Sequence, residues 1–480
     1  MLNKNLCMSL LRRTLALSML ASCFTACQEK GTSQSESESP GVALWLTTPD
    51  KSVLFERQDS SLEFGGSTNQ YPTIEINENE TYQTMDGFGF TLTGGSAMLI
   101  NQMDPQKRAA ILEELFGTDG KKIGISYLRV SIGASDLDPE VFSYNDLAAD
   151  ETDVNMEKFD LSPDKRYLIP VLKEILAINP DIKIMGSPWS PPAWMKTNNN
   201  SKGGSLKPEY YNAYAKYFIK YIQGMAEEGI KVDAITIQNE PLHPGNNPSL
   251  LMLPEDQAIF IKNHLGPAFE AANLDTKIII YDHNADRPDY PITVLNDPEA
   301  KKYVDGSAFH LYGGAIDSLS NVHEAHPDKN LYFTEQWIGA PGDFPENLHW
   351  HTKNLIIGAP RNWSKTVLEW NLAADPQQNP HTPGGCTECL GAVTIDGNEV
   401  ARNPAYYIVA HASKFARPGS VRIGSNVPNG LPNVAFKTPE GHNVLIMLND
   451  SQSTQSFNIS HKGKQVTTTL SAGAVGTYVW

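Results

Sequence analysis

The segment AITIQNEPLHP, residues 234–244, indicates the fold because its polarity changes abruptly along the chain. Its first four residues are apolar or β-branched, which is typical of a buried strand. The next three are Gln, Asn and Glu, and the proline that follows cannot continue the hydrogen bonding of a strand. The segment therefore predicts a buried strand that ends by presenting an amide and a carboxylate at the edge of a sheet.

The same pattern occurs at seven other places in the chain. These are MDGFGFTLTGG (85–95), ISYLRVSIGASD (125–136), IKIMGSPWSPPAW (182–194), KIIIYDHN (277–284), GSAFHLYGG (306–314), LYFTEQW (331–337) and TVLEWNLA (366–373). Amphipathic stretches typical of helices, such as 208–229 and 254–273, separate several of them. Eight strands alternating with helices predict an α/β fold, a (β/α)₈ TIM barrel, whose polar strand ends meet at one mouth.

The two ends of the chain follow a different pattern. Residues 415–480 alternate apolar and polar positions between turn signals, which predicts strands joined as hairpins. Residues 43–80 also read as strands. We expect the two segments to form one β-sandwich beside a barrel that spans 81–414.

The first residues predict export rather than a part of the fold. Three basic residues precede a short apolar run, so residues 1–22 are interpreted as a signal peptide, because the run is too short to span a membrane. LASC, ending at Cys23, resembles the lipobox of bacterial lipoproteins, in which that cysteine is lipidated. Cys27 is a second candidate, and a plain secretory signal is the alternative. Residues 23–42 predict a disordered tether, so membrane contact is expected through the lipid anchor alone, at the cell surface or in the periplasm.

Charge and cysteine content restrict the possible ligands. The formal net charge of −17 argues against nucleic acid and against anionic membrane surfaces, and it permits a neutral sugar. Cys386 and Cys389 form CTEC, which in an exported protein favours a local disulfide over a zinc site. We find no metal-ligand cluster and no glycine-rich nucleotide motif, so neither a metal nor a cofactor is predicted.

Glu240 and Glu335 are the candidate catalytic residues. They end the fourth and seventh of the eight segments, which face each other across a barrel mouth. A carboxylate pair separated by about 5 Å fits retaining glycoside hydrolysis, and a pair separated by more than about 6.5 Å fits inversion. The sequence does not set this distance, so both outcomes stay open at this point.

Other polar and aromatic residues at the predicted mouth suit a sugar. Asn239 can bond a sugar 2-hydroxyl, and Arg129 can keep a carboxylate ionised. His310 and Tyr312 either orient the nucleophile or are satisfied polar groups at the rim. Six tryptophans fall near strands three, seven and eight, where their faces can stack on sugar rings or serve in packing. They are Trp189, Trp194, Trp337, Trp350, Trp363 and Trp370.

The motifs QNEP, TEQ, MDGFGFTLTGGSA, YLRVSIGASD, SPWSPPAWMKTN and SKFARPGSVRI together resemble glycoside hydrolase family 30. That family contains glucosylceramidase and microbial β-1,6-glucanases. The resemblance implies a barrel with a side-associated β-sandwich, retaining chemistry, Glu240 as acid/base and Glu335 as nucleophile. It also implies a sugar subsite lined by Asn239, Trp189, Arg129, His310, Tyr312 and Trp370.

One departure bears on the substrate. Gly94 stands where glucosylceramidases are expected to carry an aspartate that contacts glucose, and the loop GGCTECLGA (384–392) looks more like the β-1,6-glucanase branch. The sequence therefore favours an endo-β-1,6-glucanase. A glucosylceramidase-like or other exo-β-glycosidase acting on a β-glucoside is the alternative, and a non-catalytic carbohydrate-binding lipoprotein is an alternative of another class.

Overall fold

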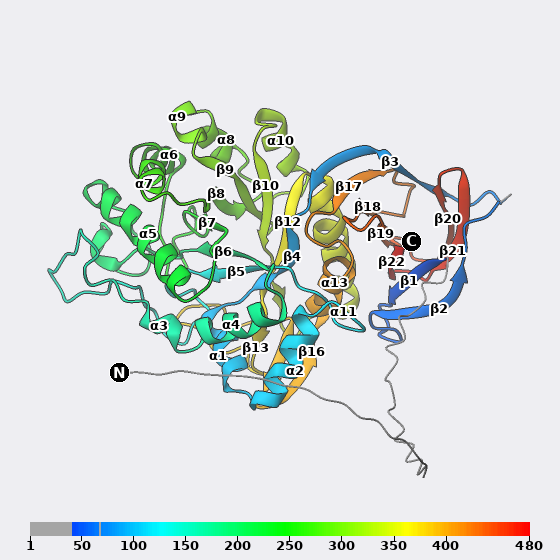
Figure 1. Cartoon of the computed structure of the whole chain (residues 1–480), viewed down its shortest axis with the longest axis horizontal. Helices are drawn as coiled ribbons and strands as arrows, with labels where there is room; N and C mark the ends of the chain where they lie inside the picture. Colours follow the sequence, from blue (N-terminus) through cyan, green and yellow to red (C-terminus); the bar gives the residue numbers. More distant parts are fainter. Residues whose placement is uncertain (1–40, 67–68) are drawn as a thin grey trace, which may run out of the picture. The chain divides into compact units, whose positions relative to one another are not determined.

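A computed structural model describes residues 41–66 and 69–480 (Figure 1). The predicted signal peptide, Cys23, Cys27 and all but the last two residues of the predicted tether lie outside the described residues. No helix in the described part of the chain has both the length and the apolarity needed to cross a membrane.

The predicted (β/α)₈ barrel is confirmed, and each of the eight predicted segments supplies one strand. The closed barrel consists of β4 (Gly87–Thr91), β5 (Tyr127–Ser131), β6 (Lys183–Ser187), β7 (Ala234–Thr236), β8 (Lys277–Asn284), β9 (Val304–His310), β10 (Asn330–Glu335) and β12 (Ser364–Asn371). All neighbouring strands run parallel. Their carboxyl ends therefore meet at one mouth.

Helices cover the outside of the barrel. They are α1 (Gly94–Gln102), α2 (Pro105–Phe116), α3 (Ser162–Lys165), α4 (Leu168–Ile178), α5 (Tyr211–Glu227), α6 (Pro254–Phe260), α7 (Gly266–Ala271), α8 (Asp289–Leu295), α9 (Pro298–Lys301), α10 (Ser318–Ala325), α11 (Phe344–His351), α12 (Ala359–Arg361) and α13 (Pro404–Ser413). The predicted helix 254–273 comprises α6 and α7, joined by a π-helical turn. At the start of α2, Asp104 caps the backbone N–H groups of Gln106 and Lys107, and proline occupies the first turn.

The barrel interior consists of an apolar layer below a polar one. The lower layer is formed by Tyr127, Met185, Ala234, Ile279, Ala308, Tyr332 and Leu368. Side chains alternate along a strand, so the residue two positions further on points inward again, nearer the mouth. On six of these strands that residue is Arg129, Ser187, Thr236, His310, Thr334 or Trp370. The sequence thus places a packed floor directly beneath a polar pocket.

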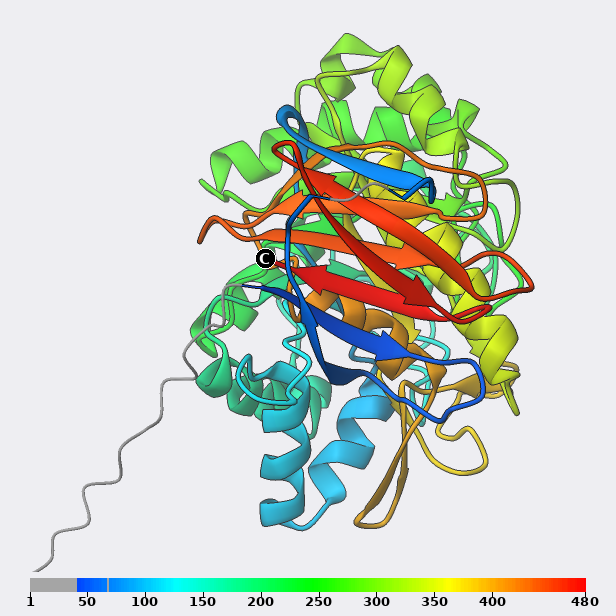
Figure 2. The same cartoon turned by 90° about the vertical axis from the view of Figure 1, so that its right-hand side faces the viewer.

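Both ends of the chain form one sheet, as the β-sandwich prediction required (Figure 2). Its order is β2–β1–β22–β19–β18–β17–β3–β20–β21, and β1 pairs antiparallel with β22. The strands are β1 (Val42–Thr47), β2 (Glu56–Leu62), β3 (Thr73–Thr84), β17 (Val421–Ser425), β18 (Asn433–Lys437), β19 (Asn443–Leu448), β20 (Gln455–His461), β21 (Lys464–Leu470) and β22 (Val475–Val479). A bridge between Gly65 and Gln465 brings the two ends of the sheet together. The sheet therefore curls into a sandwich whose continuous hydrogen bonding leaves few open edges.

The sheet is apolar on both faces. Ala435 and Leu445 belong to the sandwich's own core, whereas Phe436 and Val444 belong to the core of the barrel. This alternation explains the unbroken apolar runs of β18 and β19. At the same junction, His411 of α13 lies between the hydroxyls of Thr47 and Thr477, at 2.8 Å from each.

Short strands occupy the segments that follow β10 and β12. They are β11 (Ile338–Gly339), β13 (Ala373–Ala374), β14 (Cys389–Leu390), β15 (Val393–Asp396) and β16 (Glu399–Arg402). β11 pairs with β14, which ties the segment after β10 to the segment after β12 at the barrel mouth.

Candidate active site

The turn after β7 aims two predicted residues into the pocket. The backbone N–H of Asn239 donates to the Pro188 carbonyl at 2.8 Å, and that of Glu240 donates to the Asp282 carbonyl at 3.0 Å. Glu240 adopts a φ of +45°, a conformation that non-glycine residues rarely occupy. Neighbouring strands thus hold the Glu240 carboxylate in place against local backbone strain, which is a recurrent feature of functional sites.

Asp282 reaches the pocket through a bulge in β8. Counting two residues on from Ile279 would place Tyr281 inward, but Tyr281 and Asp282 both have positive φ, at +71° and +67°. The pairing with β9 shifts between Tyr281 and His283, and Tyr281 packs outward against Tyr290 of α8. The bulge therefore turns an aspartate into the barrel, as bulges near active sites often do.

Arg129 lies at the centre of the polar layer and is completely buried. Its Nη1 donates to Glu335 Oε2 at 2.6 Å, and its Nη2 donates to Asp282 Oδ2 at 2.8 Å. It also donates to Asn239 Oδ1 at 2.6 Å and to Ser187 Oγ at 3.0 Å. Because Asn239 Oδ1 is engaged in this way, the amide nitrogen is the group of Asn239 that can donate to a sugar hydroxyl.

The two glutamates converge on one another. His310 Nδ1 is 3.3 Å from Glu240 Oε1 and 3.7 Å from Glu335 Oε1. One ring nitrogen of His310 and one carboxylate oxygen of each glutamate all lie within 4.8 Å of one another. Tyr312 donates its hydroxyl to Glu335 Oε1 at 2.9 Å. The separation matches the short spacing of retaining glycosidases rather than the wide spacing of inverting ones.

Charge, more than burial, determines the protonation of His310. Burial lowers the pKa of His310, but the charge of Glu335 and the contacts of His310 with Asp282 and Glu240 raise that pKa to about 9. Burial would raise the pKa of Asp282, but Arg129 and His310 hold it well below its usual range. At neutral pH, an arginine, a protonated histidine and an ionised aspartate therefore surround the glutamate pair.

The two glutamates differ in their surroundings. Burial raises the pKa of Glu335. Burial acts in the same direction on Glu240, but contact with His310 lowers its pKa. Glu335 accepts hydrogen bonds from Arg129 and Tyr312, whereas Glu240 faces His310, His283 at 3.8 Å and the Asn246 amide at 3.5 Å.

The tryptophans divide between the mouth of the barrel and its packing, the two roles that the sequence left open. The Arg129 guanidinium lies 4.8 Å from the ring centre of Trp189 and 5.8 Å from that of Trp370, and Trp337 packs beside these two. Trp363 lies at the opposite end of the barrel, because it precedes β12. There it stacks on His323 at 3.8 Å. Trp189, Trp337 and Trp370 therefore form an aromatic wall beside Arg129, in which Trp189 and Trp370 are buried and Trp337 is partly exposed. Trp363 serves in packing.

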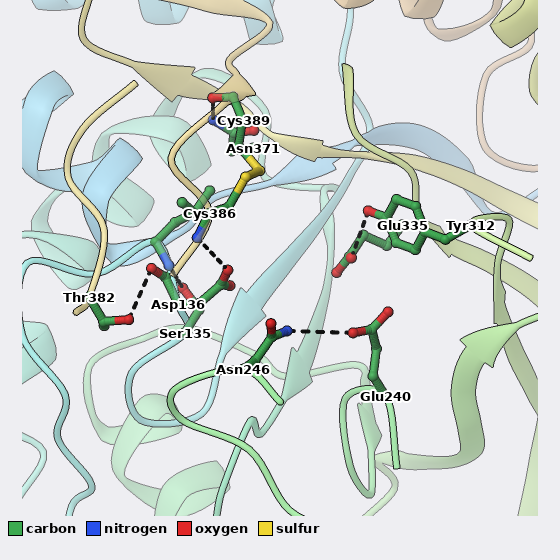
Figure 3. Close-up of a disulfide and its surroundings, with 11 residues drawn as sticks. Ser135, Asp136, Glu240, Asn246, Tyr312, Glu335, Asn371, Thr382, Cys386 and Cys389 are labelled. Carbon is green, nitrogen blue, oxygen red and sulfur yellow. Dashed lines mark hydrogen bonds between the residues drawn. A yellow bond between two sulfur atoms is a disulfide. The ribbon is translucent and has the colours of Figure 1, made fainter. Parts of the chain in front are cut away.

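Asp136 is a site residue that was absent from the predicted set (Figure 3). It follows β5 and is almost buried, and burial together with the charges of Glu335 and Glu240 raises its pKa to about 7. Gly94 lies elsewhere: a Cβ there would stand 1.7 Å from Asp138 Oδ1. The pocket thus has a carboxylate close to both glutamates even though Gly94 supplies none. Its position at the end of the segment 125–136 was the signal that could have identified it.

Glu240, His310 and Glu335 are close enough together to hold a metal ion. Arg129 already lies beside this group, because its Nη1 donates to Glu335 Oε2 at 2.6 Å. The guanidinium charge opposes the binding of a second cation at the glutamates.

A closed parallel barrel with two buried glutamates facing each other across its mouth defines a barrel glycoside hydrolase. The chain belongs to glycosyl hydrolase family 30. Residues 85–416 match the family's TIM-barrel domain, and residues 419–478 match its beta sandwich domain.

Known proteins of this family include close relatives in sequence and in structure. An endo-1,6-beta-D-glucanase of Aspergillus fumigatus, neg1, is 35% identical over 405 residues, which cover 78% of this chain and 80% of that protein. The solved structure of the endo-beta1,6-glucanase BT3312 superposes with a TM-score of 0.85 at 38% identity, covering 92% of this chain and 99% of that one. Putative glucosylceramidase 1 of Caenorhabditis elegans is 30% identical, covering 85% of this chain and 82% of that protein.

Proposed function

We propose that this hydrolase is a retaining endo-β-1,6-glucanase in which Glu335 is the nucleophile and Glu240 the acid/base. The observation that carries the proposal is the glutamate pair, whose facing atoms lie within 4.8 Å of one another and of His310 Nδ1. That spacing leaves room for a sugar carbon between the carboxylates but not for an additional water molecule.

The hydrogen bonds support this division of roles. Glu335 attacks the anomeric carbon while the bond between that carbon and the leaving oxygen breaks, and Glu240 donates a proton to the leaving oxygen. In the second step Glu240 takes a proton from water, and the water oxygen displaces Glu335 from the sugar. Arg129 and Tyr312 stabilise Glu335 as an anion when it leaves, and Asn239 can donate to the 2-hydroxyl as charge develops.

The pKa directions in the free protein are the reverse of those expected for the acid and the nucleophile. A resting proton shared between His310 and Glu240 accounts for the lowered pKa of Glu240, because the two groups are 3.3 Å apart. When His310 holds the proton, the pKa of Glu240 is lowered. Transfer of that proton to Glu240 generates the acid without adding charge to the pocket, and Glu335 stays ionised beside Arg129.

The substrate assignment draws on the relatives. The sequence and the structure with the highest identities reported above both carry the name endo-β-1,6-glucanase. Trp337, which is partly exposed and packs beside the buried Trp189 and Trp370, offers an aromatic face to a sugar ring. A glucosylceramidase-like exo-β-glycosidase is the second candidate, favoured by the Caenorhabditis elegans relative.

Product analysis distinguishes these functions. The protein is incubated with linear β-1,6-glucan, β-1,3-glucan and an aryl β-glucoside. We expect a ladder of β-1,6-oligosaccharides whose newly formed reducing ends are β-anomers in proton NMR spectra recorded at once. Release from the aryl glucoside with an intact polymer would indicate the exo-glycosidase, and α-anomers would overturn the retaining mechanism.

Azide rescue separates the roles of the two glutamates. In Glu240→Ala, azide should restore turnover and give a β-glycosyl azide, because the nucleophile is intact and the general base is missing. In Glu335→Ala, azide should replace the nucleophile itself and give an α-glycosyl azide. The opposite pairing of products would exchange the two assignments.

Export and lipid anchoring at Cys23 are also proposed, on the support of the LASC motif alone. We expect the protein expressed in a bacterial host to incorporate labelled palmitate, and we expect Cys23→Ala to abolish the incorporation. Loss of label in Cys27→Ala alone would move the anchor to Cys27, and an unlabelled wild-type protein would leave the plain secretory signal.

A further inference from the structure

The loop between β13 and β15 carries the disulfide Cys386–Cys389, and it forms part of the pocket (Figure 3). Cys389 is 3% exposed and packs in one cluster with Leu137, Trp189 and Trp370. Its carbonyl accepts a hydrogen bond from the Asn371 amide at 3.3 Å. The loop is therefore integrated into the aromatic wall of the pocket.

The same loop holds Asp136 by its backbone and by its side chain. The N–H of Cys386 donates to Asp136 Oδ2 at 3.2 Å, and the N–H of Thr382 donates to the Asp136 carbonyl at 2.9 Å. Gly385 allows this close approach, because a Cβ there would stand 2.3 Å from the Asp136 carbonyl oxygen. In Figure 3 the Asp136 carboxylate lies on the side of the loop that faces Glu335 and Glu240.

Cys386 and Cys389 are three residues apart, so their disulfide closes a single turn and does not by itself order the whole loop between β13 and β15. The disulfide closes the turn that presents the Cys386 N–H, and β14 then fixes Cys389 by pairing with β11 just after Trp337. A carboxylate that accepts a backbone N–H bond is held in one orientation, which reduces the entropy that sugar binding must overcome.

We propose that the Cys386–Cys389 disulfide is a positioning element of the sugar subsite, which holds the Asp136 carboxylate toward the glutamates through the Cys386 N–H. The inference rests on the proposed function and extends it: the loop tightens binding of a β-linked glucose unit, and its redox state regulates that binding. Reduction by a dithiol transfers two electrons and two protons to the cystine. It gives two cysteine thiols and one cyclic disulfide of the reductant.

A binding cycle tests the proposal independently of turnover. The probe is a glucose-configured iminosugar, whose dissociation constant is measured by calorimetry on wild type, Cys386→Ala/Cys389→Ala, Asp136→Asn and the triple variant. We expect each of the first two changes to weaken binding about tenfold, the usual effect of losing a hydrogen bond to a charged group. In the Asp136→Asn background, removal of the disulfide should change the constant by less than about twofold, because interacting groups are not additive.

Two further measurements keep the proposal testable if the double alanine variant is unstable. Dithiothreitol treatment of the wild-type protein should give the same tenfold loss, and reoxidation should reverse it. Gly385→Ala should also weaken binding, because its Cβ displaces the loop from Asp136. Gly66→Ala is the matched control, since a Cβ at Gly66 has nothing within 4 Å.

The pH profile gives a readout that a purely structural disulfide would not change. Burial raises the pKa of Asp136, the charges of Glu335 and Glu240 raise it further, and the Cys386 N–H lowers it. Loss of that N–H should move the acid limb of kcat/KM for an aryl β-glucoside to higher pH. The proposal would be overturned if removal of the disulfide weakened iminosugar binding equally in the wild-type protein and in Asp136→Asn. An unchanged dissociation constant after reduction would also overturn it. Tight iminosugar binding without any glycoside cleavage would instead count against the proposed function.

Discussion

His310 at the barrel mouth and His411 at the barrel–sandwich junction are both completely buried, yet they hold opposite protonation states. Burial lowers the pKa of His411 to about 3, since its ring lies between the hydroxyls of Thr47 and Thr477 and against the edge of Phe55, all of them uncharged. His310 undergoes the same desolvation, but Glu335, Asp282 and Glu240 raise its pKa to about 9. The charges around a buried imidazole, and not the depth of burial, determine whether it carries a proton.

The difference between the two regions reflects what each must do. A junction that only joins two domains is most stable with neutral, satisfied polar groups. The mouth concentrates three ionised or shared carboxylates around Arg129 and His310, an arrangement that adds little or nothing to stability. These charged groups do supply a preorganised electrostatic field for a sugar that develops positive charge. Four variants test this contrast.

Glu335→Gln should have the largest effect, a fall in kcat of more than about 10⁴-fold on β-1,6-glucan. The amide cannot attack the sugar, whereas polysaccharide binding should survive because the pocket keeps its shape. The substitution also removes the largest charge that raises the pKa of His310, so NMR titration of that imidazole should show a lower pKa, closer to that of His411.

Glu369→Gln is the matched control for that variant. Glu369 is a buried glutamate of β12 that contacts His351 Nδ1 at 2.7 Å, outside the pocket. Its removal should lower stability and leave kcat of the folded protein within about twofold. Normal turnover in Glu335→Gln would reject the nucleophile assignment.

Asp282→Asn should destabilise the fold by about 3–5 kcal/mol, because it leaves the buried Arg129 with fewer anionic partners. Asp282 Oδ1 also accepts from Thr334 and faces His310 Nε2 at 3.1 Å, so kcat should fall as well. Urea denaturation monitored by tryptophan fluorescence gives the free energy of unfolding. A loss below about 1 kcal/mol would show that Arg129 and His310 tolerate the neutral amide and that the contrast with the junction is overstated.

The sequence predicted the barrel and the convergence of Glu240 with Glu335 because both follow from strand order and from polar residues at strand ends. Asp136 follows the same rule, because it ends the segment 125–136. Asp282 could not be inferred from alternation, since a bulge at Tyr281 reverses which residue points inward. The separation of the glutamates depends on side-chain packing around His310, which no spacing in the chain encodes. Trp363 lies away from the mouth, although it is close in sequence to a mouth-facing residue, because it precedes β12.

His411→Gln tests the neutral side of the comparison through pH. The folded-state pKa is lower than the ordinary value of 6.5, so the stabilisation from the neutral ring is complete above pH 6.5 and is lost as pH falls toward 3. In that window the wild-type protein should lose about 1.4 kcal/mol per pH unit through this group. Its advantage over His411→Gln should therefore shrink by about 2–3 kcal/mol between pH 7 and pH 4.5.

Tyr312→Phe should have the smallest effect, because it removes one hydroxyl and leaves every charge in place. That hydroxyl donates to Glu335 Oε1 at 2.9 Å, and the hydrogen bond from Arg129 Nη1 to Glu335 Oε2 remains when it is lost. We expect kcat to fall about tenfold with little change in KM, since the bond matters most when Glu335 leaves as an anion. Steady-state kinetics on an aryl β-glucoside with a good leaving group should show the loss most clearly, because departure of Glu335 from the sugar then limits the rate. A change confined to KM would instead make Tyr312 a binding residue, and the stabilisation of the leaving carboxylate would depend on Arg129 alone.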